Sequence, residues 1–117
     1  MNSDIPTSEL PRLGIDISKL TFDVCLCLPQ GGTRSAQFSN DDKGFAQLDA
    51  WLTQHQVTTT FAGLEATGPY GARLLWNLHT QGHRVCQLNA RRVKDYARSQ
   101  GRRVKTDRVD AALIAAY

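Results

Sequence analysis

Three strand-like segments follow one another between residues 13 and 39, before any helical pattern appears. LGIDIS (13–18) alternates apolar and polar residues, TFDVCLCL (21–28) is more apolar, and TRSAQFS (33–39) follows a Gln-Gly-Gly turn. A period of two is that of a β-strand, and such short links predict an antiparallel meander. This meander constrains the fold most, because its apolar face has to be covered by helices that come later in the chain.

A helix and a further strand are predicted directly after the meander. Asn40 or Asp41 is placed to cap the helix, and TTTFAGLE (58–65) predicts a fourth strand that ends at Glu65. Apolar residues at three- and four-residue spacing give the helix an amphipathic stripe, which consists of Phe45, Leu48, Trp51 and Leu52.

The same alternation continues toward the C-terminus. Pro69 suits the first turn of a second helix, which stops at Gly82, and HRVCQL (83–88) predicts a fifth strand. The basic segment 91–100 has a helical pattern, and Thr106 is placed to cap a last helix.

The chain is therefore expected to be an α/β domain over residues 13–117, with an extended or disordered lead-in over residues 1–12. Its mixed five-stranded sheet has three antiparallel strands and then two parallel crossovers, and is flanked by helices. The first strand pairs in parallel with the fourth, so their carboxyl ends lie side by side, where ligands gather in open sheets. Asp16 and Glu65 both occupy this place.

The charge is distributed unevenly along the chain. Residues 1–65 carry 4 basic and 8 acidic side chains, whereas residues 66–117 carry 10 basic and 3 acidic ones. Charge runs are often solvated faces, but this density, with Tyr96 interleaved, favours a nucleic-acid partner. The predicted nucleic-acid surface consists of Arg91, Arg92, Lys94, Arg98, Arg102, Arg103, Lys105 and Arg108.

Two carboxylates end this basic run, in GRRVKTDRVDAAL (101–113). Asp107 and Asp110 are three residues apart, so they share a face of a helix. Taken singly, each acid has a structural explanation, such as a helix cap or an ion pair. If the last helix crosses the strand ends, four carboxylates converge and require a hard divalent cation, Mg²⁺ or Mn²⁺ in its place. The predicted metal-binding residues are Asp16, Glu65, Asp107 and Asp110.

The 3 cysteines lack CxxC spacing, which predicts reduced and buried thiols. A zinc site can be assembled from His79, His83 and Cys86, but no fourth ligand is evident, and surface histidines are the simpler interpretation. No apolar run is long enough to span a bilayer, and the N-terminus lacks the features of a signal peptide, so a cytoplasmic location is expected.

Three motifs in order resemble the DEDD transposases, the insertion-sequence family numbered one-hundred-ten, which includes DNA invertases. They are GIDISK (14–19), LEATGPYG (64–71) and HRVCQLNARRVKDYARSQGRRVKTDRVDA (83–111), and the resemblance spans residues 13–117. GIDISK by itself is also similar to the start of sugar kinases, whereas EATGPY followed by GRRVKTDRVDA is specific to the family.

The resemblance implies a RuvC-like domain of ribonuclease H fold, with the four acids of the family at Asp16, Glu65, Asp107 and Asp110. It also implies recombination of insertion-sequence ends with target DNA, guided by a structured RNA, in a homo-oligomer. The family carries a serine nucleophile on a second, C-terminal domain. Asn89-Ala90 stands where relatives often have Asn-Pro, a difference that concerns a turn.

Other functions stay open at this point. They are a non-catalytic nucleic-acid-binding module, a Holliday-junction-resolvase-like nuclease domain, and part of a sugar-kinase-like ATPase, which needs a glycine-rich phosphate loop. The final segment DAALIAAY still consists of good helix formers at Tyr117, and no serine here has a recognisable general-base partner. This chain alone is therefore expected not to carry out recombination. The serines considered are Ser18, Ser35, Ser39 and Ser99.

Overall fold

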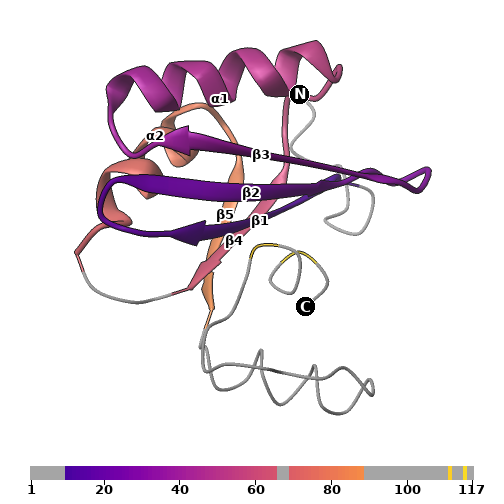
Figure 1. Ribbon diagram of the computed structural model, residues 1–117. Coiled ribbons are helices and arrows are strands. Elements are labelled where there is room, and N and C mark those ends of the chain that lie inside the picture. Colours follow the sequence, from indigo (N-terminus) through magenta and orange to yellow (C-terminus); the bar gives the residue numbers. More distant parts are fainter. Residues whose placement is uncertain (1–9, 66–68, 89–110, 112–114, 116–117) are drawn as a thin grey trace.

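The computed structural model describes residues 10–65 and 69–88 of the 117-residue chain, together with Ala111 and Ala115. Within these residues, strands and helices follow in the order predicted for the meander and the two crossovers (Figure 1). The elements are β1 (Arg12–Ile17), β2 (Thr21–Cys27), β3 (Thr33–Ser39), α1 (Asp42–Gln54), β4 (Phe61–Glu65), α2 (Ala72–Thr80) and β5 (Arg84–Leu88).

The strands form one sheet in the order β3-β2-β1-β4-β5. β1 pairs with β2, and β2 with β3, in antiparallel register, whereas β4 runs parallel to both β1 and β5. This arrangement confirms the predicted α/β class and the mixed five-stranded sheet. The predicted last helix and the basic segment 91–100 lie outside the described residues, except for Ala111 and Ala115, which are both helical.

β4 begins at Phe61, so the prediction that this strand starts at residue 58 is wrong by three residues. The backbone N–H of Thr60 donates to Nδ1 of His83 at 3.0 Å instead of to a neighbouring strand. Phe61 is the first residue in the ladder, opposite Arg12 on one side and Arg84 on the other. The β-branched run before it is therefore not an extension of the strand, and of its three threonines only Thr60 is buried.

α2 begins at Ala72 with Gly71 as its N-cap, so the prediction that Pro69 lies in its first turn is wrong. A Cβ at Gly71 would lie 3.0 Å from Cδ1 of Ile17, which is tighter than ordinary contact. The helix ends where it was predicted to end, because Gly82 follows it with a φ of 92°. No helix in the described part of the chain has the length and apolar character needed to cross a membrane.

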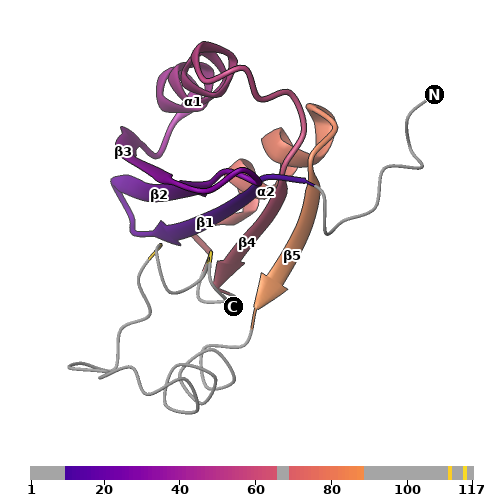
Figure 2. The same cartoon turned by 90° about the vertical axis from the view of Figure 1, so that its right-hand side faces the viewer.

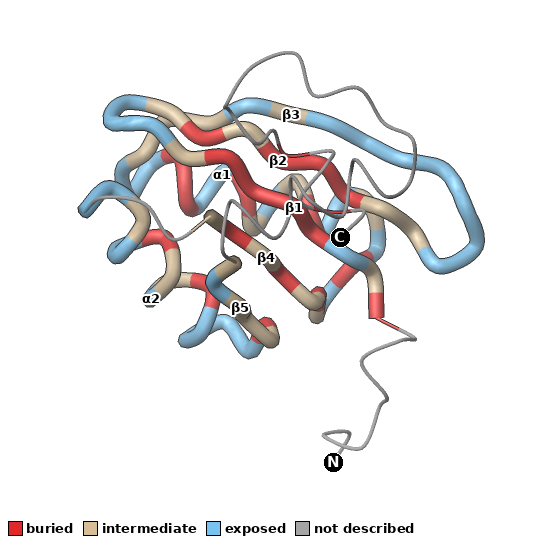
Figure 3. Tube along the Cα trace, turned by 90° about the horizontal axis from the view of Figure 1, so that it is seen from below, coloured by how far each residue is buried: buried red, intermediate tan, exposed pale blue. Residues whose placement is uncertain are grey.

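Both helices cover the same face of the sheet, and α1 lies over this face in Figure 2. Phe22 lies at the centre, with its ring centroid 5.6 Å from that of Phe38 and 6.0 Å from that of Phe45. Buried residues concentrate along β1 and β2, while β3 is largely exposed (Figure 3). The core on this apolar face consists of Leu13, Ile15, Phe22, Val24, Leu26, Phe45, Leu48, Leu52, Val57, Ala62, Leu64, Leu74 and Leu78.

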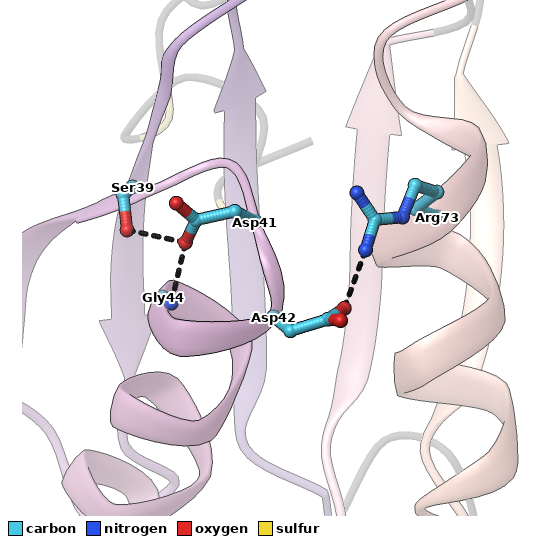
Figure 4. A network of polar contacts seen from close by, with 5 residues as sticks. All are labelled: Ser39, Asp41, Asp42, Gly44 and Arg73. Carbon is cyan, nitrogen blue, oxygen red and sulfur yellow. Dashed lines mark hydrogen bonds and ion pairs between the residues drawn. The ribbon is translucent and has the colours of Figure 1, made fainter.

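A polar network caps the N-terminus of α1 and links α1 to α2 (Figure 4). Asp41 is the N-cap, one of the two residues predicted, and its carboxylate accepts from the Gly44 N–H at 2.9 Å and from the Ser39 hydroxyl at 2.6 Å. The hydrogen bond from Ser39 is the main reason that the pKa of Asp41 is lowered, and the bond from Gly44 adds to it. Arg73 on α2 donates to Asp42 at 2.5 Å, an exposed ion pair that contributes little stability.

Candidate functional site

The second face of the sheet differs from the helix-covered one. Because strand side chains alternate, Gly14 and Asp16 lie on the face opposite to the apolar residues of β1. Ala111 and Ala115 pack there against Cys25, in a small cluster separate from the main core. Figure 2 shows the two short yellow segments at these alanines on the opposite side of β1 from α1.

Asp16 and Glu65 end neighbouring parallel strands. The last paired residues of β1 and β4 are Ile15 and Leu64, so Asp16 and Glu65 come next on each strand. Ile15 and Leu64 belong to the core of the apolar face, and their successors therefore both lie on the second face. The arrowheads of β1 and β4 lie side by side in Figure 1. Asp16 is buried, with 7% of its surface exposed, and Glu65 is half-buried.

Asn40 holds together the two loops that follow these carboxylates. Its Nδ2 donates to the backbone carbonyl of Ser18 at 3.1 Å and to that of Tyr70 at 2.9 Å. Ser18 comes two residues after Asp16, and Tyr70 comes five residues after Glu65. One side-chain amide, directly before the N-cap of α1, thus links residues that follow both strands.

A further carboxylate, Asp23, lies beside Asp16 and is not among the predicted site residues. The β1–β2 register pairs Asp16 with Asp23, whose Oδ1 accepts from Nε2 of Gln37 at 2.8 Å. The short link between the two strands could have predicted this pair, because it sets residue 16 opposite residue 23. Both acids line an open cavity of about 410 Å³, whose lining residues are Asp16, Asp23, Val24, Cys25, Ser35, Ala36 and Ala111.

Half of the predicted carboxylate set lies outside the described residues, namely Asp107 and Asp110. The same is true of the predicted nucleic-acid surface, which consists of Arg91, Arg92, Lys94, Arg98, Arg102, Arg103, Lys105 and Arg108. Over residues 10–65 and 69–88, no three His, Cys, Asp or Glu side chains are grouped closely enough to hold a metal ion. Ala111, which follows Asp110 in the chain, lines the same cavity as Asp16.

The cysteines and His83 correct two expectations. All three thiols are free, but Cys25 alone is buried, whereas Cys27 and Cys86 are half-buried. Burial, and then the neighbouring Cys25, raise the pKa of Cys27. His83 is buried and not at the surface, and its Nδ1 lies 2.9 Å from the hydroxyl of Thr60 and accepts the Thr60 N–H. Burial lowers the pKa of His83, which favours the neutral ring. The Nδ1 atom of this ring is already hydrogen-bonded to Thr60.

A sheet of this order, with carboxylates at the adjoining ends of β1 and β4, is the framework of a ribonuclease H-like domain. The family model for the DEDD transposases of insertion-sequence type one-hundred-ten, described as a transposase, matches residues 13–117. The chain therefore belongs to this transposase family, as its motifs indicated.

Two pilin gene-inverting proteins, from Moraxella lacunata and Moraxella bovis, are similar to this chain. Each is 37% identical over 107 residues, which cover 90% of this chain and 33% of the relative. The chain thus spans about a third of the length of these relatives.

Proposed function

We propose that this chain supplies the carboxylate-bearing, metal-binding domain of a transposase that exchanges DNA strands. The observation that carries the proposal is the register of β1 and β4, which sets Asp16 and Glu65 at adjoining strand ends. Membership in the transposase family over residues 13–117 supports the reaction class, and the names of the gene-inverting relatives support DNA as the substrate.

The donor set fits a hard divalent cation, because carboxylate oxygens are the ligands that Mg²⁺ and Mn²⁺ prefer. We assign these ligands to Asp16, Glu65, Asp107 and Asp110. When bound, such an ion polarises a phosphate oxygen and stabilises the charge that develops during phosphodiester exchange. The position of Ala111 in the cavity of Asp16 supports a place for its neighbour Asp110 near the strand ends.

In this proposal the strand carboxylates bind the metal ion, and the cationic residues bind nucleic-acid phosphates. The strand carboxylates hold their oxygens at adjoining positions, since the ladder joins β1 to β4, and Asn40 joins Ser18 to Tyr70 beyond the strand ends. The cationic residues from Arg91 to Arg108 bind the phosphates of DNA or RNA beside the acids. Positive charge there also offsets the repulsion between the carboxylates and the nucleic-acid backbone.

Calorimetric titration with Mn²⁺ tests the metal site. Asp16→Asn removes one ligand charge and is expected to weaken binding by about tenfold or more, in the range typical for altered metal shells. Asp42→Asn is the matched control, because the same change falls on an exposed residue of α1. Equal affinity in the wild type and Asp16→Asn would contradict the site.

The salt dependence of binding tests the nucleic-acid surface. Each neutralised phosphate adds roughly 0.9 to the slope of log affinity against log salt, so replacing Arg102 and Arg103 by Ala should flatten it by about 1 to 2. Replacing Arg34 and Lys43 by Ala removes the same charge from β3 and α1 and should leave the slope unchanged. An unaltered slope for the Arg102 and Arg103 double variant would exclude this surface.

Strand exchange itself is proposed for a full-length family member, acting as a homo-oligomer with a structured guide RNA in the cytoplasm. The 117-residue polypeptide, tested by itself with Mg²⁺, guide RNA and a donor–target DNA pair, should form neither exchanged strands nor a serine–DNA adduct. A full-length gene-inverting relative is the positive control. Binding of DNA or RNA that requires no metal ion would favour a non-catalytic nucleic-acid-binding module. Cleavage of four-way DNA junctions would favour a resolvase-like nuclease.

A further inference from the structure

We propose that Gly14 is a positioning residue for the carboxylate site, an inference that rests on the proposed function. Gly14 leaves its own position on the second face of β1 without a side chain, and backbone atoms of Ala111 and Ala115 approach the strand there. This approach sets how close the chain bearing Asp107 and Asp110 comes to Asp16 and Glu65.

The distances show how close the approach is. A Cβ added at Gly14 would lie 2.1 Å from the carbonyl oxygen of Ala111, 2.4 Å from the backbone N of Ala115 and 2.8 Å from its Cβ. Ordinary van der Waals contact begins at 3.4 Å. The two nearest atoms belong to the backbone, so no side-chain rotation relieves the overlap. Ala111 and Ala115 are buried, at 7% and 4% exposed, which shows that the contact is closed to solvent.

Glycine is required here by space and not by backbone conformation. Gly14 lies within β1 and is not among the glycines with positive φ, which in the described residues are Gly31, Gly32 and Gly82. Any residue adopts a strand conformation of this kind. On β4 the partner of Gly14 is Gly63, so two adjacent positions of the sheet carry no side chain.

The contact connects the two stretches of chain that carry the two halves of the proposed metal site. Gly14 precedes Asp16 by two residues on the same face of β1, and Ala111 directly follows Asp110. Ala111 also lines the cavity that Asp16 shares with Asp23. The backbone that meets Gly14 is therefore covalently continuous with the two carboxylates supplied from the C-terminal side.

A methyl group at position 14 separates these halves. It would need about 1.3 Å of additional space to bring the Ala111 oxygen from 2.1 Å to ordinary contact at 3.4 Å. Mg²⁺ requires near-octahedral geometry with ligands at about 2.0 to 2.1 Å, and functional groups must be held within about 0.5 Å of their working positions. The displaced carboxylates then cannot complete the coordination shell, although the core on the other face keeps its packing.

Mn²⁺ calorimetry on Gly14→Ala, with circular dichroism to confirm the sheet, is the first test. Affinity is expected to fall by about 10- to 100-fold, as for lost supporting contacts at metal sites. Gly31→Ala is the matched control, because it places the same methyl at a strained φ of 105° in open space within the β2–β3 turn. It should keep wild-type affinity. Wild-type affinity in Gly14→Ala would overturn the proposal.

A second variant and a second measurement keep the outcomes distinct. If Gly14→Ala fails to fold, the Ala111→Gly and Ala115→Gly double variant removes the two side chains that pack against Cys25 beside Gly14, and should weaken Mn²⁺ binding several-fold. Amide hydrogen exchange at Ala115 reports the contact without metal, and should be faster in Gly14→Ala. Absence of Mn²⁺ binding by the wild type would reject the proposed function alone. Unchanged exchange at Ala115 would reject the role of Gly14.

Discussion

The two faces of the sheet are built from the same strands but from different kinds of contact. On the apolar face, large side chains such as Phe22, Leu48 and Leu74 interlock with no more than 2% of their surface exposed. On the second face, Gly14 and the two alanines meet through backbone atoms, beside the buried Asp16. Alternation along each strand keeps these environments apart.

This difference separates stability from function. Burying a large apolar side chain contributes roughly 1.5 to 3 kcal/mol, so the apolar face supplies most of the free energy of folding. The second face buries small residues and charge, which contribute little or oppose folding. Within residues 10–65 and 69–88, the helix-covered face therefore buries most of the large apolar side chains.

The largest effect should come from a cavity in the apolar face. Phe22→Ala removes a fully buried ring that packs against Phe38 and Phe45, and should lower the free energy of unfolding by about 3 to 5 kcal/mol. Cys25→Ala, on the second face, should cost about 1 kcal/mol. Urea unfolding measures both. Equal losses would show that the second face stabilises the fold as much as the first.

Metal should stabilise the second face independently of the first. At a Mn²⁺ concentration about 100 times Kd, the wild type should gain about 2.7 kcal/mol of unfolding free energy. Leu48→Ala, in the apolar core, should be less stable by about 2 to 5 kcal/mol but keep this increment. Asp16→Asn should lose it. Loss of the increment in Leu48→Ala would show that the two faces are energetically coupled.

The smallest effect concerns His83 and pH. Burial lowers the pKa of His83 in the folded chain, so the unfolded chain takes up a proton at higher pH. Stability from this residue is full above the ordinary histidine pKa of about 6.5 and decreases as the pH falls below it, until the folded-state pKa is reached. Urea unfolding from pH 7.5 downward should show this decrease.

His83→Asn is the informative variant, because its side-chain oxygen can still accept from Thr60 and does not titrate. It should have a smaller decrease of stability with falling pH than the wild type. His79→Asn, the same change at an exposed residue of α2, is the control. An identical pH dependence in His83→Asn and the wild type would contradict the assignment.

The sheet could be predicted from sequence because each of its signals is local. Alternation in LGIDIS placed Asp16 on the face away from the core, and the run ending at Glu65 located the other strand end. Thr58–Thr60 resembled a strand because threonine is β-branched, but the Thr60 N–H donates to His83 and not to a neighbouring strand. Pro69 suggested a helix start, but the chain first bends past Asn40.

The site was predictable only in part, because its remaining features depend on contacts between distant residues. Asp23 becomes part of the site only because the register of β1 and β2 pairs it with Asp16. Gly14 looked like an ordinary polar-face residue of a strand. Only glycine fits there because backbone atoms of residues almost a hundred positions later lie close to it. The burial of His83 likewise follows from Thr60, 23 residues away.

The strand order also has a consequence for the order of events during folding. The meander pairs residues close in sequence, so β1, β2 and β3 can associate as soon as they are synthesised, with Asp16 and Asp23 already opposed. β4 joins β1 across about fifty residues, as Arg12 and Phe61 show, and closing such a loop is slow compared with a hairpin. Glu65 therefore reaches Asp16 late, after α1 has had time to form. The acids of the two strand ends are therefore expected to come together only when the core between α1 and the sheet is forming.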